Sequence, residues 1–354
     1  MIYYLSAFIF FYIFLISSQQ KNGIEYVYIF VGMIPLILLV VLRGNVGTDT
    51  ATYLSAFEEY RRSSENIENH EPLFFLLSVA LVRAFDSSRI ALISVGILIT
   101  LILLGSSALL ERRGLIYGAC VVPQFYLDMT MNGVRYGLSF SLVVLATSFL
   151  VRGYKRYFWT LAAVAGLAHI SGLLLALLLY STTLSLKRAV VDWRFFSGVI
   201  ISAIGFIYYF SEYLQIKFLA YELFQSPSEF SGIAPLFVST AALFAWYFDA
   251  PRHERSKTLV FTLFVLALVA FLAARYTYAG LRFQYLILFL IFLSFQYRIS
   301  AFRIKPQRRT YLLFFAVGLL GLSTQLRNLL EGAGEGDSPS IPYTFFWQIS
   351  PSRP

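Results

Sequence analysis

Charged residues are scarce in this chain, and cysteine is almost absent. Only 13% of the 354 residues are Asp, Glu, Lys or Arg, against roughly 25% in a soluble domain. No polar stretch is longer than residues 43–71, which excludes a separate soluble domain. The single cysteine, Cys120, lies in an apolar run. An intramolecular disulfide is therefore excluded, and a small packing residue is the ordinary interpretation.

Motifs of several enzyme classes are also missing. The sequence contains no Walker loop, no dinucleotide-binding fingerprint, and no CxxC or HExxH metal motif. An enzyme that uses cytoplasmic nucleotide sugars would need a soluble nucleotide-binding region, which this chain lacks. The energy for any transfer reaction must then come from the substrate itself, for example from a lipid-diphosphate leaving group.

Apolar residues dominate instead, at 58% of the chain with a mean hydropathy of +0.70. Runs long enough to cross a ~30 Å hydrocarbon core recur along the whole length. We expect an all-α fold, a polytopic transmembrane helical bundle of about 10 to 12 spans. It should form one domain over residues 1–330, with the first run retained as a span rather than removed as a signal peptide. Full spans are predicted at residues 2–17, 24–42, 89–110, 114–129, 135–151, 195–211, 234–248, 258–274, 281–297 and 310–330.

The net charge of +9 reports topology rather than nucleic-acid binding, because most cations lie in short loops between apolar runs. Loops such as 152–156, 252–257 and 298–309 should be cytoplasmic. The loop at 43–71 and the tail at 331–354 hold more of the acids and should be extracytoplasmic. In that tail, the aromatic residues are expected to lie on the membrane surface as an anchor; they are Tyr343, Phe345, Phe346 and Trp347.

Two apolar segments, 72–85 and 157–180, must each begin and end on one side of the membrane if this topology holds. The first is too short to span comfortably, and Gly166, His169 and Gly172 interrupt the second. We therefore expect one or two short re-entrant or interfacial helices, with two half-length helices meeting near His169. Twelve ordinary spans with an imperfect charge bias are the alternative.

Polar residues at membrane depth are candidates for function, because burying them is costly unless they are paired. Arg43 and Asp49 share a glycine-containing turn, where Asp49 could act as a general base or hold a sugar hydroxyl. A snorkelling Arg beside an Asx turn is the ordinary alternative. Glu71 either caps a helix that starts at Pro72 or supplies a second carboxylate on the same face.

Further along the chain, Asn132 and Arg135 lie between two spans, and this Arg could grip a phosphate or pair with a nearby Asp. His169 is either a packed neutral residue or a donor that relays a proton. Arg275 and Arg282 flank a Tyr-rich turn that would form either a phosphate or sugar site or an aromatic belt.

Four of these cations, Arg43, Arg135, Arg275 and Arg282, fall on one predicted face against the charge bias. Their convergence indicates an anionic ligand at the outer membrane boundary, such as a polyprenyl diphosphate. No metal site is predicted.

Five segments in order resemble the EpsG family of exopolysaccharide-biosynthesis membrane proteins, which are grouped with Wzy-like polymerases and GT-C glycosyltransferases. The resemblance covers roughly residues 1–300, and Tyr136 stands where family members often have Gln. The matching segments are Leu42–Thr50 with Tyr53, Glu71–Phe74, Met131–Leu138, Ala165–Ser171 and Leu281–Phe283.

The resemblance implies a GT-C-like fold and a polysaccharide polymerase in the bacterial cytoplasmic membrane. The substrate would be a polyprenyl-diphosphate-linked oligosaccharide, with membrane lipid, a chain-length regulator and a flippase as further partners, and no cofactor or nucleic acid. A lipid-linked oligosaccharide flippase and a membrane O-acyltransferase with His169 as its base stay open as alternatives. The implied catalytic residues are Asp49, Glu71 and His169, and the implied ligand-binding residues are Arg43, Asn132, Arg135 and Arg282.

Overall fold

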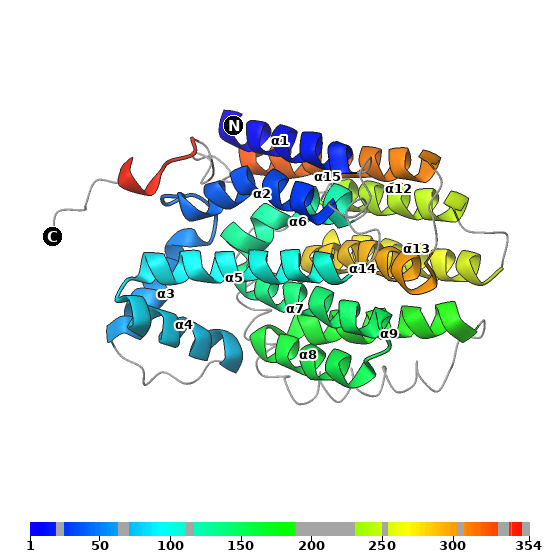
Figure 1. The fold of residues 1–354 in the computed structure, drawn as a ribbon, viewed down its shortest axis with the longest axis horizontal. Helices are drawn as coiled ribbons and strands as arrows, with labels where there is room; N and C mark the ends of the chain where they lie inside the picture. Colours follow the sequence, from blue (N-terminus) through cyan, green and yellow to red (C-terminus); the bar gives the residue numbers. More distant parts are fainter. Residues whose placement is uncertain are drawn as a thin grey trace. The chain divides into compact units, whose positions relative to one another are not determined.

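The computed structural model describes residues 1–18, 25–62, 71–110, 117–188, 231–249, 254–303, 308–331, 340 and 342–348. Across these residues the chain is helical and has no strand, which confirms the all-α prediction (Figure 1). The predicted span at 195–211 lies outside the described residues. The α-helices are α1 (Ile2–Ser18), α2 (Glu25–Val41), α3 (Thr50–Arg62), α4 (Pro72–Phe85), α5 (Ser88–Leu109), α6 (Val122–Leu127), α7 (Val134–Val151), α8 (Lys155–Ala168), α9 (Ile170–Arg188), α12 (Ile233–Asp249), α13 (Glu254–Ala274), α14 (Tyr278–Phe302) and α15 (Arg308–Glu331).

Helix length and composition support a membrane location. Among the described residues, four helices are long and apolar enough to span a bilayer. Shorter apolar helices accompany them, including α1, α2 and α4. The exact number of spans and the GT-C-like arrangement stay predictions. The four long apolar helices are Ser88–Leu109, Val134–Val151, Ala279–Phe302 and Arg308–Leu330.

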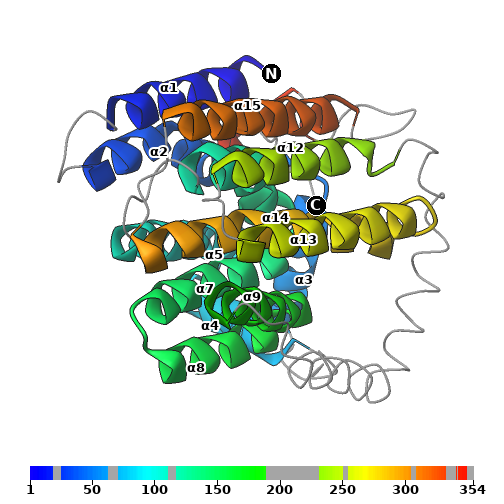
Figure 2. The same cartoon turned by 90° about the vertical axis from the view of Figure 1, so that its right-hand side faces the viewer.

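The chain forms two compact units, Met1–Leu174 with Gly318–Pro354, and Leu175–Val317. In the first unit α1 packs along α2, and α7 packs along α8, as both views show (Figure 2). In the second unit α13 packs along α14. A hydrogen bond of 2.7 Å from Gln284 Nε2 to the Gly232 carbonyl ties the start of α14 to the segment before α12.

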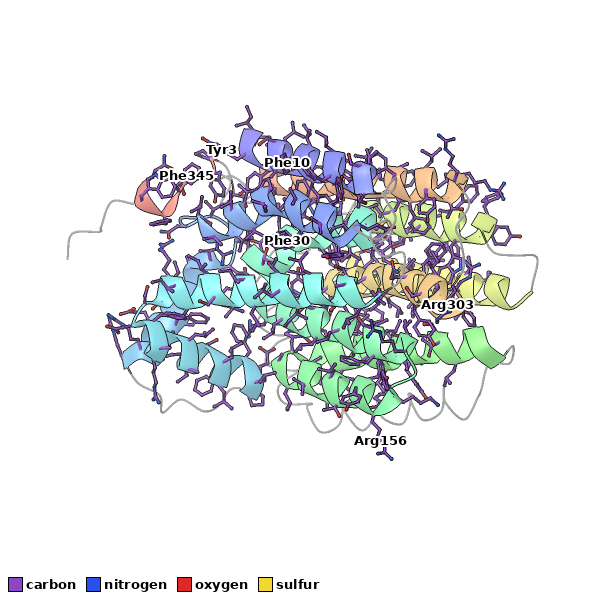
Figure 3. The ribbon with its side chains drawn as sticks, viewed as in Figure 1. Tyr3, Phe10, Phe30, Arg156, Arg303 and Phe345 are labelled. Carbon is purple, nitrogen blue, oxygen red and sulfur yellow. The ribbon has the colours of Figure 1, made fainter. Side chains whose placement is uncertain are left out.

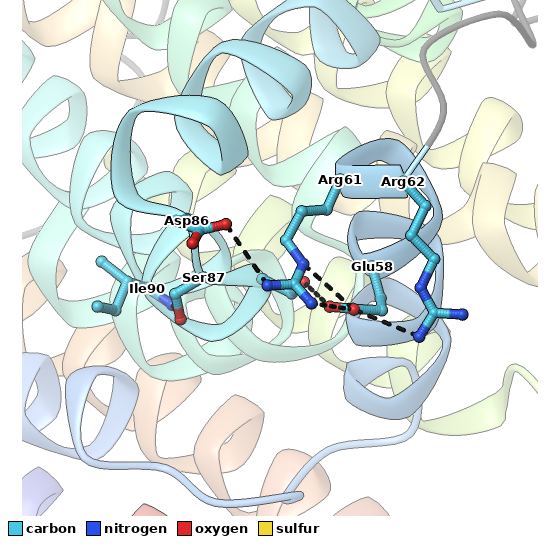
Figure 4. A network of polar contacts seen from close by, with 7 residues as sticks. Glu58, Arg61, Arg62, Asp86, Ser87 and Ile90 are labelled. Atoms are coloured by element: carbon cyan, nitrogen blue, oxygen red, sulfur yellow. Dashed lines mark hydrogen bonds and ion pairs between the residues drawn. The ribbon is translucent and has the colours of Figure 1, made fainter.

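Helix α3 occupies part of the stretch that the sequence presents as a loop. Its polar side is fixed to the α4–α5 corner by a charged network (Figure 4). Arg61 contacts Glu58 at 2.7 Å and Asp86 at 3.4 Å, and Ser88 Oγ donates to Glu58 Oε2 at 2.9 Å. Exposed pairs of this kind add little stability. They orient α3 so that Tyr53 and Phe57 pack inward against Phe74.

The predicted span 114–129 is observed as a helical run from Tyr117 to Asn132. On each side of α6 the run contains one turn of π-helix, a π-turn, at Tyr117–Val121 and at Asp128–Asn132. In the second π-turn the Gly133 N–H donates to the Asp128 carbonyl at 2.8 Å. A π-turn widens the helix and leaves carbonyls available to other partners. The Thr130 and Met131 carbonyls accordingly accept hydrogen bonds from outside the helix.

The segment predicted to break near His169 does so at that residue. Helix α8 ends at Ala168, His169 is extended at φ −164° and ψ 132°, and α9 begins at Ile170. The Ser139 hydroxyl on α7 lies 2.7 Å from the Ala165 carbonyl and 2.9 Å from that of His169. A side chain at Gly172 would collide with this hydroxyl. Whether the two helices form a re-entrant pair stays a prediction.

Candidate functional site

A buried carboxylate occupies the centre of the site. Glu71 precedes α4, where Pro72 takes the first helical position, and its exposed fraction is 7%. One oxygen, Oε2, accepts from Arg135 Nη1 at 3.0 Å, and the other, Oε1, lies 3.4 Å from His169 Nε2. Burying a carboxylate is costly unless it is paired. We call Glu71, Arg135 and His169 the Glu71 triad.

The hydrogen bonds around His169 determine where its ring proton lies. The Ser171 backbone N–H donates to Nδ1 at 3.2 Å, and the Ser171 hydroxyl lies 2.6 Å from the same nitrogen. A backbone N–H can only donate, so Nδ1 accepts and the proton lies on Nε2, facing Glu71. The extended backbone at the α8–α9 break makes this short-range contact possible.

The Arg135 side chain is fixed by buried partners, yet solvent or a ligand can still reach it. Its position in the first turn of α7 brings it to Glu71, and its guanidinium lies 5.9 Å from the centre of the Tyr53 ring. Its side chain nevertheless keeps an exposed fraction of 40%. A fixed and accessible guanidinium is well suited to bind a phosphate oxygen.

Tyr53 is a residue of the site that sequence reasoning noticed only as part of a motif. Burial raises the pKa of its hydroxyl, Arg135 opposes that rise, and Asp49 adds to it. Tyr53 therefore lies in the electrostatic field of both residues. Asp49 itself is half-buried just before α3, and its carbonyl accepts from the Tyr53 N–H at 2.9 Å.

Arg43 lies inside the protein, with an exposed fraction of 1%. Its Nη1 donates to the Thr130 carbonyl at 2.9 Å, and burial lowers its pKa to about 10. The C-terminal segment covers it: the Gly44 N–H donates to the Thr344 carbonyl at 2.8 Å, and the Phe346 N–H donates to the Leu42 carbonyl at 3.0 Å. No pattern in the sequence indicated this pairing.

The tail does not lie wholly on the surface as predicted. Tyr343 is buried, with an exposed fraction of 5%, and its hydroxyl donates to the Leu39 carbonyl at 2.7 Å. Phe345 packs against Tyr3 with ring centres 5.5 Å apart (Figure 3). Phe346 and Trp347 stay exposed, so only these two keep the character of a surface anchor.

Asn132 holds the turn that follows Arg43. Its Oδ1 accepts from the Thr48 N–H at 3.1 Å, and its Nδ2 donates to Asp128 Oδ1 at 2.9 Å. Gly47 has a φ of 109°, which only glycine adopts readily, and a side chain there would press on Asn132 Oδ1. The turn and the π-turn therefore fit together as one unit.

A pocket of about 220 Å³ opens beside Asn132. Sequence reasoning missed its α15 and tail residues. Gln325 and Asn328, three residues apart near the end of an apolar helix, were the available signal, because polar groups in such helices are costly. The lining residues are Thr48, Asp128, Asn132, Gln325, Asn328, Leu329 and Ser340.

Arg275 and Arg282 lie in the second unit, at the end of α13 and the start of α14. Both are exposed, and the Thr277 hydroxyl between them accepts from the Gly280 N–H at 2.9 Å to cap α14. The remaining predicted residues all lie in the first unit. In the described part of the chain, no three His, Cys, Asp or Glu side chains gather as a metal ion would require.

These features define a helical membrane protein that carries a charged site where several of its helices begin or end. The model of the EpsG family matches residues 25–345, nearly the whole chain, so the protein belongs to the EpsG family. The resemblance seen in the sequence is thereby confirmed, and the chain is a membrane protein of exopolysaccharide biosynthesis. No curated protein and no solved structure matches it.

Proposed function

We propose that this protein is a polysaccharide polymerase of the bacterial cytoplasmic membrane. It would join oligosaccharide repeats that are linked to undecaprenyl diphosphate, at the outer face. The observation that carries this proposal is Arg135, a cation fixed by a buried carboxylate yet 40% exposed. Family membership supports the same pathway. A multi-pass GT-C-like arrangement belongs to the proposal.

In the proposed reaction, a sugar hydroxyl of one repeat attacks the anomeric carbon that joins the growing chain to its lipid diphosphate. The new glycosidic bond forms as the carbon–oxygen bond to the diphosphate breaks, and the diphosphate leaves with the electron pair. The hydroxyl proton passes to Asp49 as general base. Arg135 stabilises the negative charge on the departing diphosphate.

The contacts of Glu71 favour a positioning role over that of the base. Both of its oxygens face a partner, Arg135 on one side and His169 on the other. Glu71 and His169 therefore fix the direction of the guanidinium, and buried Arg43 holds the neighbouring turn rather than the ligand.

The test is the surface-polysaccharide ladder of a deletion strain complemented with variants. Arg135→Ala should leave caps of a single repeat, because the leaving diphosphate loses its positive partner, and Arg282→Ala tests the second Arg that the family resemblance implies. The matched control is Arg62→Ala, which removes an exposed Arg on α3. Normal chain length in both variants, with protein present in the membrane, would refute the assignment.

The deletion strain and its complemented variants also distinguish a polymerase from a flippase and from an O-acyltransferase. Lipid-linked repeats trapped on the cytoplasmic face of the deletion strain would identify a flippase. Loss of acyl groups with unchanged chain length in His169→Ala would identify an O-acyltransferase.

A further inference from the structure

The pocket beside Asn132 differs in chemistry from the Glu71 triad. Its walls come from four parts of the first unit: the turn after Arg43, the second π-turn, the end of α15 and the tail. Its volume of about 220 Å³ equals roughly seven water molecules at about 30 Å³ each. Pockets for drug-sized ligands begin at about 300 Å³, so this pocket is of a size for one small polar ring.

The groups that line the pocket match a neutral sugar. Asn132, Gln325 and Asn328 contribute amides, and Thr48 and Ser340 contribute hydroxyls, all of which both donate and accept, as sugar hydroxyls do. Asp128 adds an acceptor, and Leu329 adds an apolar contact for ring C–H groups. No Lys or Arg is among these described lining residues, and a carboxylate repels an anion. A diphosphate is therefore a poor fit.

From the tail, Ser340 lines the pocket, and a hydrogen bond holds this residue in place. The Ser340 carbonyl accepts from the Tyr4 hydroxyl at 3.1 Å. A few residues later, Tyr343 and Thr344 are hydrogen-bonded to the end of α2 and to Gly44. Removing the tail would therefore remove Ser340 from the pocket lining.

Two residues that line the pocket lie close along the chain to residues of the proposed reaction site. Asn132 lines the pocket, and Arg135 is three residues further along the chain, in the first turn of α7. Thr48 lines it, and Asp49 is the next residue. We therefore expect a ligand in the pocket to lie on the side of the protein that carries Asp49.

We propose that this pocket binds one neutral sugar of the acceptor repeat and that the C-terminal segment completes it. This inference rests on the proposed polymerase function and names the acceptor subsite. Sugar binding here holds the attacking hydroxyl near Asp49, while the diphosphate is held at Arg135.

A cysteine-protection experiment tests the pocket directly, because the one native cysteine, Cys120, is buried. The Asn328→Cys protein is labelled in right-side-out membrane vesicles with a membrane-impermeant maleimide. The probe is the oligosaccharide repeat released from the strain's own polysaccharide by partial hydrolysis. At ten times its Kd the repeat should slow labelling about tenfold, whereas inorganic diphosphate should not slow it.

Arg62→Cys, on the exposed side of α3, is the control and should react equally with and without the repeat. Thr48→Cys, at another exposed lining residue, serves as the second reporter if Asn328→Cys does not accumulate. Unchanged labelling of both reporters with the repeat present, protection by diphosphate instead, or no labelling from this side would each overturn the inference. The polymerase proposal fails separately, if Arg135→Ala and Arg282→Ala strains keep a normal ladder.

Discussion

At the residue scale, the central feature is the Glu71 carboxylate, whose partners no local sequence pattern could predict. Glu71 and Arg135 are 64 residues apart in the chain. The sequence indicated that both were candidates and that both faced the same side, because polar residues in apolar surroundings demand an explanation. Their partners could not be predicted, because pairing depends on how α4, α7 and α8 pack. The same holds for Arg43, whose burial follows from a tail about 300 residues away.

Glu71→Gln should reveal what the negative charge of Glu71 contributes to stability and to polymer formation. The amide keeps the size of the side chain but leaves Arg135 and His169 without their anion, so we expect polymer to be lost and stability to fall by about 1–3 kcal/mol. Thermal unfolding in detergent and the polysaccharide ladder measure the two effects. Glu59→Gln, an exposed change on α3, is the control. A wild-type melting temperature and ladder for Glu71→Gln would show that the triad is incidental.

The glycine at the α8–α9 break offers a matched pair of substitutions. In Gly172→Ala the new methyl group meets the Ser139 hydroxyl, so the contact that holds the break must open and His169 must shift. In Gly105→Ala nothing lies within 4 Å of the new atom, and the helix should gain about 0.5–1 kcal/mol. Thermal unfolding should move in opposite directions for the two variants. Equal shifts would mean that the break is not held by close packing.

At the element scale, the long apolar helices could be predicted from the sequence, because a long run of apolar residues is by itself a sufficient signal. The break at His169 also followed, because Gly and polar residues interrupt the segment. Helix α3 was missed: it is short and polar, and its position depends on the contacts of Arg61 with Asp86 and of Glu58 with Ser88. The π-turns and the tail pairing were missed as well, because both arise from long-range hydrogen bonds.

Tyr343 should contribute more to the stability of the protein than its exposed neighbours in the tail do. Tyr343→Phe removes the hydrogen bond to the Leu39 carbonyl and should cost about 0.5–1.5 kcal/mol. Trp347→Phe, at a side chain with an exposed fraction of 58%, should change little. Limited proteolysis of the tail and thermal unfolding report the difference. If both variants behave alike, the tail is not held by Tyr343.

At the scale of the whole molecule, composition predicted a helical membrane protein, and the family match confirms the biosynthetic class. The distribution of charged residues also predicts which ends of the helices face the cytoplasm. The cations of 152–156 and the acids of 43–71 belong to the same unit, so its orientation can be tested as a whole.

Two variants with one added cysteine each test that orientation, again because the native Cys120 is buried. Thr48 and Lys155 are both exposed side chains. In right-side-out vesicles an impermeant maleimide should label Thr48→Cys at once and Lys155→Cys only after detergent is added. The reverse order would place the Glu71 triad on the cytoplasmic side and remove the basis for an outer-face reaction.

The most direct measurement is the stoichiometry of the reaction with purified protein and a lipid-linked repeat. Undecaprenyl diphosphate released and repeats added to the chain are counted in the same sample. The proposed mechanism predicts one diphosphate carrier released for each repeat added, and neither product with Arg135→Ala. Chain growth without release of the carrier, or full activity of Arg135→Ala, would contradict it.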